Sequence, residues 1–343
     1  MRRFGSAGAA LEALPHVARA GGRRKPLRIP AEAEILREID SWNAIGAELL
    51  TIGDYRYPVL LAETEDAPPV FGLLGDAALL ERPMIGIVGA RNASANGLNF
   101  ARRLAADLAA AGLVVVSGLA RGIDAAAHKG ALGGGTVGVL GCGLDVIYPP
   151  QNRELFDLMR EQGAIVSEFP PGAPAQAANF PRRNRLISGM ARAVAVIEAN
   201  RRSGSLITAR LALEQGREVF AVPGFPLDPR SEGPNWLLRQ GATLLENADD
   251  IIGEVGPGAR RYRVRENVID SGFSAADTVT EVSEDMRDRL YSLLSSAPVT
   301  VDELVDECHV SHQEAATALL ELELAGRVQR LPGNRVAVLI LSD

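Results

Sequence analysis

Cysteine and long apolar runs are both nearly absent from this chain of 343 residues. Only Cys142 and Cys308 occur, far apart and in different predicted elements, which excludes a disulfide framework and the clustered spacing of a metal site. No stretch approaches the roughly 18 consecutive apolar residues of a membrane span, and no apolar signal core follows Arg2 and Arg3. We therefore expect a cytoplasmic protein with no metal and no membrane partner.

Lysine is also scarce, because only Lys25 and Lys129 occur among the 36 basic residues. Such a skew is more typical of gene composition than of selection for guanidinium chemistry, so arginine frequency by itself carries no weight. The net charge of −7 argues against a generally basic surface, and any contact with a polyanion must come from local clusters of cations. With 47% apolar and 23% charged residues, the chain has enough material for two or three compact units.

The middle of the chain alternates short apolar runs with helical stretches such as 97–111 and 205–215. This spacing is typical of repeated βαβ units and predicts a Rossmann-like, doubly wound α/β fold with a mostly parallel sheet. The expected strands are 84–89, 113–117, 136–140, 164–167, 193–198, 218–222 and 242–245. Ligands of such sheets bind beyond the carboxyl ends of the strands. The loops expected to converge there are 89–97, 117–124, 141–148 and 199–205.

The flanking segments predict two smaller domains. Helical patterns on both sides of a charged breaker at 21–26 indicate a small helical domain at the N-terminus, and few regular elements are expected over 54–75. Three helices (284–295, 301–307 and 311–324) and a hairpin that turns at 332–334 indicate a C-terminal winged helix. The expected domains are 1–55 (helical), 56–255 (core), 256–283 (linker) and 284–343 (winged helix).

Three loops of the predicted core place small residues and arginine before a helix. They are Gly89-Ala90-Arg91 after the first strand, Ser117 to Asp124 after the second, and Arg201 to Ser205 after the fifth. Backbone amides and the helix dipole at such positions favour a bound anion such as phosphate. The glycines match neither the dinucleotide fingerprint nor the P-loop, so no nucleotide cofactor is predicted.

Each of these motifs also has a plainer interpretation. Arg91 can be a solvated loop residue, and Asp124 or Ser203 can simply cap a helix. His128 more often satisfies a buried hydrogen bond than acts as a base. We therefore assign no catalytic residue and predict a binding protein rather than an enzyme.

The segment 179–185, Asn-Phe-Pro-Arg-Arg-Asn-Arg, carries the sharpest signal. Pro181 suits the first position of a helix, N1, and three arginines follow in its first turn and a half, where each opposes the helix dipole by roughly 0.3–1 kcal/mol. Such a helix is expected to have an anionic partner, and phosphate is the natural candidate. Seven arginines and one acid, Glu198, lie between Asn179 and Arg210, which gives a local charge of +6. Phe180 offers a face for base stacking, unless it is a core residue.

Taken in order, these motifs resemble the DNA-processing protein A family (DprA, also called Smf). Further motifs of the resemblance are 138–145 with Tyr148-Pro149, 180–189 and Val222-Pro223-Gly224, and together they cover residues 50 to 250. The resemblance implies a core that binds single-stranded DNA, forms a homodimer and helps to load the RecA recombinase onto incoming DNA in natural transformation.

The same resemblance implies roles for single residues. Arg91 would bind backbone phosphate, Phe180 would stack on a base, and the arginines of 182–185 would make or support phosphate contacts. Ser117 and Gly118 would line the pocket. The full set of predicted nucleic-acid-binding residues is Gly89, Arg91, Ser117, Gly118, Arg121, Asn179, Phe180, Arg182, Arg183, Asn184, Arg185, Ser203, Gly204 and Ser205.

Both flanking domains depart from the family pattern. The N-terminal domain, of the sterile-alpha-motif type in the family, is expected to be partial here, because the chain begins nearly at Phe4. The winged helix has ten acids and five arginines over 285–343, and its expected recognition helix, 311–325, has no lysine or arginine. We expect it to repel phosphate and to mediate protein contacts or self-association, so that its deletion leaves DNA affinity nearly intact.

Two other functions remain open at this stage. The same sheet architecture resembles phosphoribohydrolases of nucleoside monophosphates, but their P-G-G-x-G-T loop is missing, since Gly133-Gly134-Gly135-Thr136 precedes a strand rather than follows one. A sequence-specific regulator that uses the winged helix is disfavoured by its acidic third helix. Anisotropy of single- and double-stranded oligonucleotides across a salt series would separate these functions.

Overall fold

The computed structural model describes residues 7–22, 27–255, 283–294, 298–331 and 334–339. The chain divides into two compact units, which we describe separately. Residues 33–262 form the α/β unit, and residues 1–32 together with 263–343 form the terminal unit. The predicted linker 256–283 lies, except for its last residue, outside the described residues. In the described ranges no helix is both long and apolar enough to cross a membrane.

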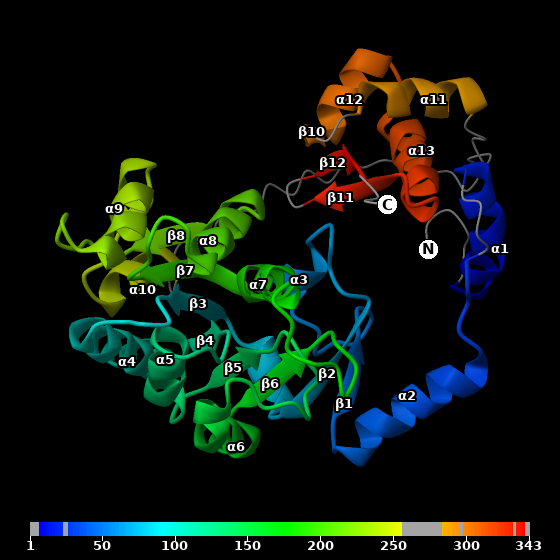
Figure 1. Cartoon of the computed structure of the whole chain (residues 1–343). Helices are drawn as coiled ribbons and strands as arrows, with labels where there is room; N and C mark the ends of the chain where they lie inside the picture. Colours follow the sequence, from blue (N-terminus) through cyan, green and yellow to red (C-terminus); the bar gives the residue numbers. More distant parts are fainter. Residues whose placement is uncertain (1–6, 23–26, 256–282, 295–297, 332–333, 340–343) are drawn as a thin grey trace. The chain divides into compact units, whose positions relative to one another are not determined.

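A single twisted sheet forms the centre of the α/β unit (Figure 1), with the strand order β1-β2-β6-β5-β4-β3-β7-β8-β9. Its strands are β1 (Glu48–Thr51), β2 (Val70–Gly75), β3 (Met84–Gly89), β4 (Val114–Ser117), β5 (Thr136–Val139), β6 (Ala164–Ser167), β7 (Ala191–Ile197), β8 (Glu218–Ala221) and β9 (Thr243–Leu244). All pairs from β6 to β9 along this order are parallel. The seven predicted strands and the Rossmann-like fold class are confirmed.

Helices cover both faces of the sheet because the central strands are apolar on both sides. Ile85 and Ile87 of β3 pack in the core on the side of α4 and α5, whereas Met84 and Val88 pack on the side of α7 and α8. This alternation follows from the period of two along a strand. The helices are α2 (Glu32–Ala44), α3 (Val59–Ala62), α4 (Ala95–Ala110), α5 (Ile123–Ala131), α6 (Arg153–Gln162), α7 (Asn179–Met190), α8 (Gly204–Glu214), α9 (Glu232–Arg239) and α10 (Ala248–Val255).

The segment 54–75, for which few regular elements were expected, contains α3 and the whole of β2. Strand β2 pairs antiparallel with both β1 and β6, with Leu73 opposite Val166. Phe71 and Leu73 are buried in the core. The prolines at 68 and 69 therefore mark the entrance to a strand rather than a continuing loop.

The strand order reverses between β3 and β7. From β3 the chain proceeds through β4, β5 and β6 in one direction, and then crosses back along α7 to place β7 on the other side of β3. The register pairs Gly86 with Val194 and Gly89 with Ile197. The loops that follow β3 and β7 therefore diverge to opposite faces of the sheet and leave a crevice between them.

The terminal unit combines the winged helix with the first helix of the chain. Its elements are α1 (Ala7–Ala20), α11 (Glu284–Leu293), β10 (Val299–Thr300), α12 (Val301–Cys308), α13 (His312–Leu324), β11 (Val328–Leu331) and β12 (Arg335–Val338). Helix α1 packs on α13. Arg287 of α11 donates hydrogen bonds to the Ala20 carbonyl at 2.6 Å and to Glu321 Oε2 at 3.0 Å. The predicted winged helix is confirmed, while the exact domain boundaries remain predictions.

Candidate nucleic-acid interface

Four loops at the carboxyl ends of the parallel strands converge on two adjoining cavities, as the strand pattern predicted. The main cavity, about 600 Å³, is formed by the loops after β3, β4 and β7 and by the starts of α7 and α8. The side cavity, about 270 Å³, is formed by the loops after β4 and β5. Arg91, Arg121 and Phe180 line both cavities. The site therefore lies at the topological switch point of the sheet.

The loop after β4 is held in shape by a buried carboxylate. Asp124 Oδ2 accepts hydrogen bonds from the amides of Gly118 at 3.1 Å and Ala120 at 3.4 Å. Burial raises the pKa of the Asp124 carboxyl, and the positive charge of Arg183 opposes that shift. Asp124 therefore holds the loop in place, as its plainer interpretation suggested.

Arg183 lines the main cavity, but its side chain is buried in the wall. The residue is 4% exposed, and Nη1 donates hydrogen bonds to the carbonyls of Gly118, at 2.7 Å, and Val139. Burial lowers the pKa of Arg183 to about 10, so the side chain is still charged at neutral pH. A Cβ on Gly118 would lie 2.5 Å from Arg183 Nη2, so only glycine leaves room for this guanidinium. Arg183 thus fixes the ends of β4 and β5.

His128 is a buried structural residue. Leu119 N donates to His128 Nε2 at 3.3 Å, so Nδ1 carries the proton and donates to Thr136 Oγ1 at 2.7 Å. Burial, followed by the charge of Arg183, lowers the pKa of His128 to about 3. The interpretation of His128 as a satisfied core histidine is confirmed.

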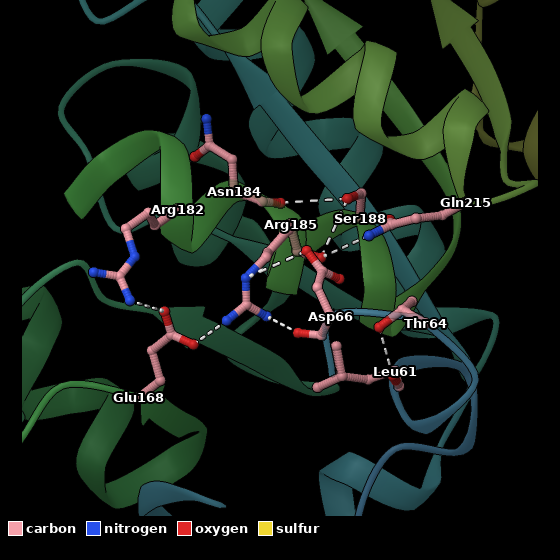
Figure 2. Close-up of polar contacts among 9 residues, drawn as sticks. All are labelled: Leu61, Thr64, Asp66, Glu168, Arg182, Asn184, Arg185, Ser188 and Gln215. Atoms are coloured by element: carbon pink, nitrogen blue, oxygen red, sulfur yellow. Dashed lines mark hydrogen bonds and ion pairs between the residues drawn. The ribbon is translucent and has the colours of Figure 1, made fainter. Parts of the chain in front are cut away.

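Arg185 is bound to carboxylates of its own chain (Figure 2). Its Nη2 forms an ion pair with Glu168 Oε2, its Nη1 donates to the Asp66 carbonyl at 2.8 Å, and its Nε lies 3.6 Å from Asp66 Oδ2. Arg182 Nη2 lies 4.0 Å from Glu168 Oε1, and its guanidinium covers the ring of Phe169 at 5.5 Å. Neither arginine lines a cavity. The anion expected to offset the arginines of this helix is therefore supplied in part by Glu168 and Asp66.

The available cations come from the loops. Arg91, Arg121 and Arg202 are exposed and line the main cavity, and within the described ranges none of their guanidinium groups forms an ion pair or a hydrogen bond. The Arg91 guanidinium lies 5.3 Å from the centre of the Phe180 ring, and Phe180 lies 5.5 Å from Tyr148. Positive charge and aromatic faces thus meet where the two cavities join.

The loop after β7 closes the opposite side of the main cavity. Ser203 Oγ accepts from Ser205 N at 3.3 Å and caps α8, as its plainer interpretation held. Asn184 of α7 donates to the Gly204 carbonyl at 3.3 Å and joins the starts of the two helices. The main cavity is also lined by Ser203, Gly204 and Ser205. The loop therefore caps α8 and lines the cavity at the same time.

The start of α4, expected to hold a phosphate, is occupied by a carboxylate. Glu198, directly after β7, accepts from Ser94 N at 2.8 Å and also from Ser94 Oγ. A Cβ on Gly97 would lie 2.6 Å from the Glu198 carboxyl carbon. This expectation is therefore corrected, because a second anion at Ser94 would be repelled by Glu198.

The remaining predicted residues divide between structural and cavity positions. Gly89 lines the main cavity and Gly118 the side cavity. Ser117 is fully buried and donates to the Ile87 carbonyl at 2.6 Å, and Asn179 donates to the Gly141 carbonyl at 3.1 Å. Cavity residues outside the predicted binding set include Tyr148, Asn200, Arg202 and Arg230. Their signal was adjacency, since Asn200 and Arg202 lie within a loop already identified.

These features define a Rossmann-like protein with a cation-lined crevice at its switch point. A model of the DNA recombination-mediator protein A family matches residues 48–256, a DprA winged helix domain matches 274–334, and a DprA-like N-terminal HHH domain matches 1–41. The chain therefore belongs to the DNA recombination-mediator protein A family.

Individual relatives agree with this assignment. Protein Smf of Escherichia coli (strain K12) is 42% identical over 286 residues, 82% of this chain and 74% of the relative. The crystal structure of DNA processing protein A from Streptococcus pneumoniae has a TM-score of 0.64 and 39% identity over 71% of this chain and 86% of that one. The structure of DNA processing protein A from Helicobacter pylori, described for its single-stranded DNA binding mode, has a TM-score of 0.55 and 31% identity over 60% of this chain and 94% of that one.

Proposed function

We propose that this chain binds single-stranded DNA, without catalysing a reaction, through the crevice at the switch point, and that it acts in DNA processing during natural transformation. The observation that carries the proposal is the junction of Arg91 with Phe180 between the two cavities. A cation and an aromatic face at one point suit a phosphate and its neighbouring base. The relative from Helicobacter pylori, which binds single-stranded DNA, supports the same ligand.

The charges of the main cavity favour a polyanion. Five arginines and a single acid, Asp124, line it. Asp124 is buried and accepts from two loop amides, so its charge is directed away from the open side. Arg91, Arg121 and Arg202 are exposed, and Arg230 is half-buried. Arg230 is also paired with Asp228 at 2.8 Å, which reduces its share of the attraction.

A non-catalytic role is supported by the same carboxylate. Hydrolysis of a glycosidic bond needs a carboxyl group that faces the reacting atoms, whereas the one carboxylate lining the main cavity is committed to the backbone. The buried histidine beside it is held in one tautomer by Leu119 and Thr136. Neither group is placed to transfer a proton to a ligand.

We also propose two partners, a second copy of the chain and the RecA recombinase. Strand β9 ends the sheet, and large apolar side chains are exposed on it and on the segment between β8 and β9: Phe225, Leu227, Trp236 and Leu244. An exposed edge strand with apolar neighbours is suited to pairing with another chain. The test is the mass of the chain in solution, which Leu244→Asp is expected to reduce from dimer to monomer.

The DNA proposal is tested by fluorescence anisotropy of labelled single- and double-stranded oligonucleotides of equal length across a salt series. Phosphate-led binding to a single strand gives a log–log slope of about −0.7 for each phosphate neutralised. We expect tighter binding to the single strand, with no dependence on sequence. Equal affinity for the duplex, or binding that ignores salt, would contradict the proposal.

A further inference from the structure

A third cavity, which the proposed site does not include, lies between α4 and α5. Its volume is about 270 Å³. Leu98 and Arg102 of α4 line one side, and Ala125, Ala126 and Lys129 of α5 line the other. Residues 98 and 102 of α4 are four positions apart, as are residues 125 and 129 of α5. Each pair therefore lies on one face of its helix. We call this cavity the α4–α5 groove.

The groove is open because the two helices approach closely below it. A Cβ on Gly130 would lie 2.1 Å from the Arg102 carbonyl oxygen, so the helix backbones nearly touch there. Apart from Lys129, the residues of α5 that line the groove, Ala125 and Ala126, are small, as is Gly122 just before the helix. The floor is thus apolar and shallow, and the charges stand along its rim.

The charged residues that line the groove are all cations. Arg91, Arg102 and Lys129 are exposed, and no acid lines the groove. In the portions of the chain that the structure describes, none of the three forms an ion pair. The nearest acid along α4, Asp107, is 3.8 Å from Arg103, and the acid of α5, Asp124, is bound to the loop amides. Positive charge in the groove is therefore not neutralised within the α/β unit.

Arg91 connects the groove to the site already described, because it lines all three cavities. A chain of phosphates that passes Arg91 in the main cavity has two more cations in line on the far side. We propose that the α4–α5 groove is a second phosphate subsite, in which Arg102 and Lys129 bind the backbone of the same single strand as it leaves the main cavity. This inference rests on the proposed function and adds the path of the strand to it.

The test compares two double variants of the full chain with oligothymidylates of increasing length. The first, Arg102→Gln with Lys129→Gln, removes both groove cations. The control, Arg103→Gln with Arg160→Gln, removes the same charge from exposed positions of α4 and α6 outside the cavities. All four side chains are exposed, so thermal unfolding should be unchanged in both proteins.

For the groove variant we expect wild-type affinity on the shortest oligomers that bind and a severalfold loss on longer ones, with a salt slope about 1.4 smaller for the two lost phosphates. The control should follow the wild type at every length. A loss that is equal at all lengths, or one shared by the control, would overturn the subsite. If the wild type binds no single strand at all, the proposed function fails. If the wild type binds and the groove variant shows no loss of affinity at any length, only the proposed subsite fails.

Discussion

The arginines of α7 and those of the loops differ in what they are bound to, although both sets belong to one crevice. Arg183 and Arg185 of α7 are bound within the chain, to backbone carbonyls and to the carboxylates of Glu168 and Asp66. Arg91 and Arg202 of the loops have no such partners among the described residues and line the main cavity. The arginines are therefore most clustered in sequence along α7, whereas the arginines that are available to a ligand lie in the loops.

The largest expected effect is on folding, from Arg183→Met. The substitution keeps much of the volume but removes the donor of two buried carbonyls, and each buried group left without its partner costs roughly 1–3 kcal/mol. Urea unfolding should show the loss, while the salt slope of DNA binding measured at low temperature should stay unchanged. A stable Arg183→Met protein with a smaller salt slope would mean that Arg183 contacts phosphate directly. The distinction between the α7 arginines and the loop arginines would then not hold.

Arg91→Ala should have the largest effect on binding. A hydrogen bond to a charged group contributes about 1.5–3 kcal/mol, which corresponds to a loss of affinity of about tenfold to somewhat over a hundredfold. The salt slope should fall by about 0.7 and the urea midpoint should not move. The matched control is Arg182→Ala on α7, because Arg182 is exposed but does not line the main cavity. This substitution should change the affinity and the salt slope little. If the two variants lose affinity equally, the cavity does not define the site.

The burial of neutral His128 makes stability depend on pH, because burial and the charge of Arg183 lower the pKa of His128 to about 3. Because the unfolded chain binds the proton with a pKa near 6.5, stability contributed by neutral His128 is complete above that pH. It is lost as the pH falls from about 6.5 to about 3, by about 2 kcal/mol at pH 5. Urea unfolding of the wild type and of His128→Gln at pH 7 and 5 measures the difference, since other groups titrate in both. An equal loss in both proteins would show that His128 is not the group involved.

Phe180→Ala tests the aromatic part of the site. Loss of one base–aromatic stack costs about 1–3 kcal/mol, and the salt slope should be unchanged because no charge is removed. Tyr148→Ala, at the second ring of the pair, should give a smaller loss. The salt slope separates this variant from Arg91→Ala, for which the slope should fall. A reduced slope for Phe180→Ala would indicate that the ring acts only by holding Arg91.

The smallest effect is expected from removal of the terminal unit, residues 1–32 and 263–343. The described part of α13 is acidic and has no lysine or arginine to attract phosphate. The affinity of the remaining α/β unit for single-stranded DNA should stay close to that of the full chain in anisotropy titrations. A large loss would assign DNA contacts to the terminal unit.

The sequence predicted the parallel sheet because buried strands between helices leave a continuous apolar signal, as in 84–89. It did not predict β2, whose apolar run Val70–Gly75 follows two prolines and pairs antiparallel at one side of the sheet. The convergence of the loops followed from topology alone, and the cavities confirm it. The binding roles of the residues there remain predictions.

The roles of the α7 arginines could not be deduced from their order. Arg183 points at the ends of β4 and β5, and Arg185 at residues 17 and 119 positions away in sequence. Such distances are set by tertiary packing and leave no local pattern. The groove cations Arg102 and Lys129 were hidden for the same reason, since they lie on different helices 27 positions apart in sequence.

The hydrogen bond from Arg287 to the Ala20 carbonyl spans 267 positions of the chain. Helix α1 is synthesised first, yet α13, the helix on which it packs, follows the entire α/β unit. During translation the apolar side chains of α1 that end up buried, Val17 and Ala18, therefore have no partner until the last domain has been made. We expect the α/β unit to fold first during synthesis, whereas the terminal unit can assemble only after α13 has been made.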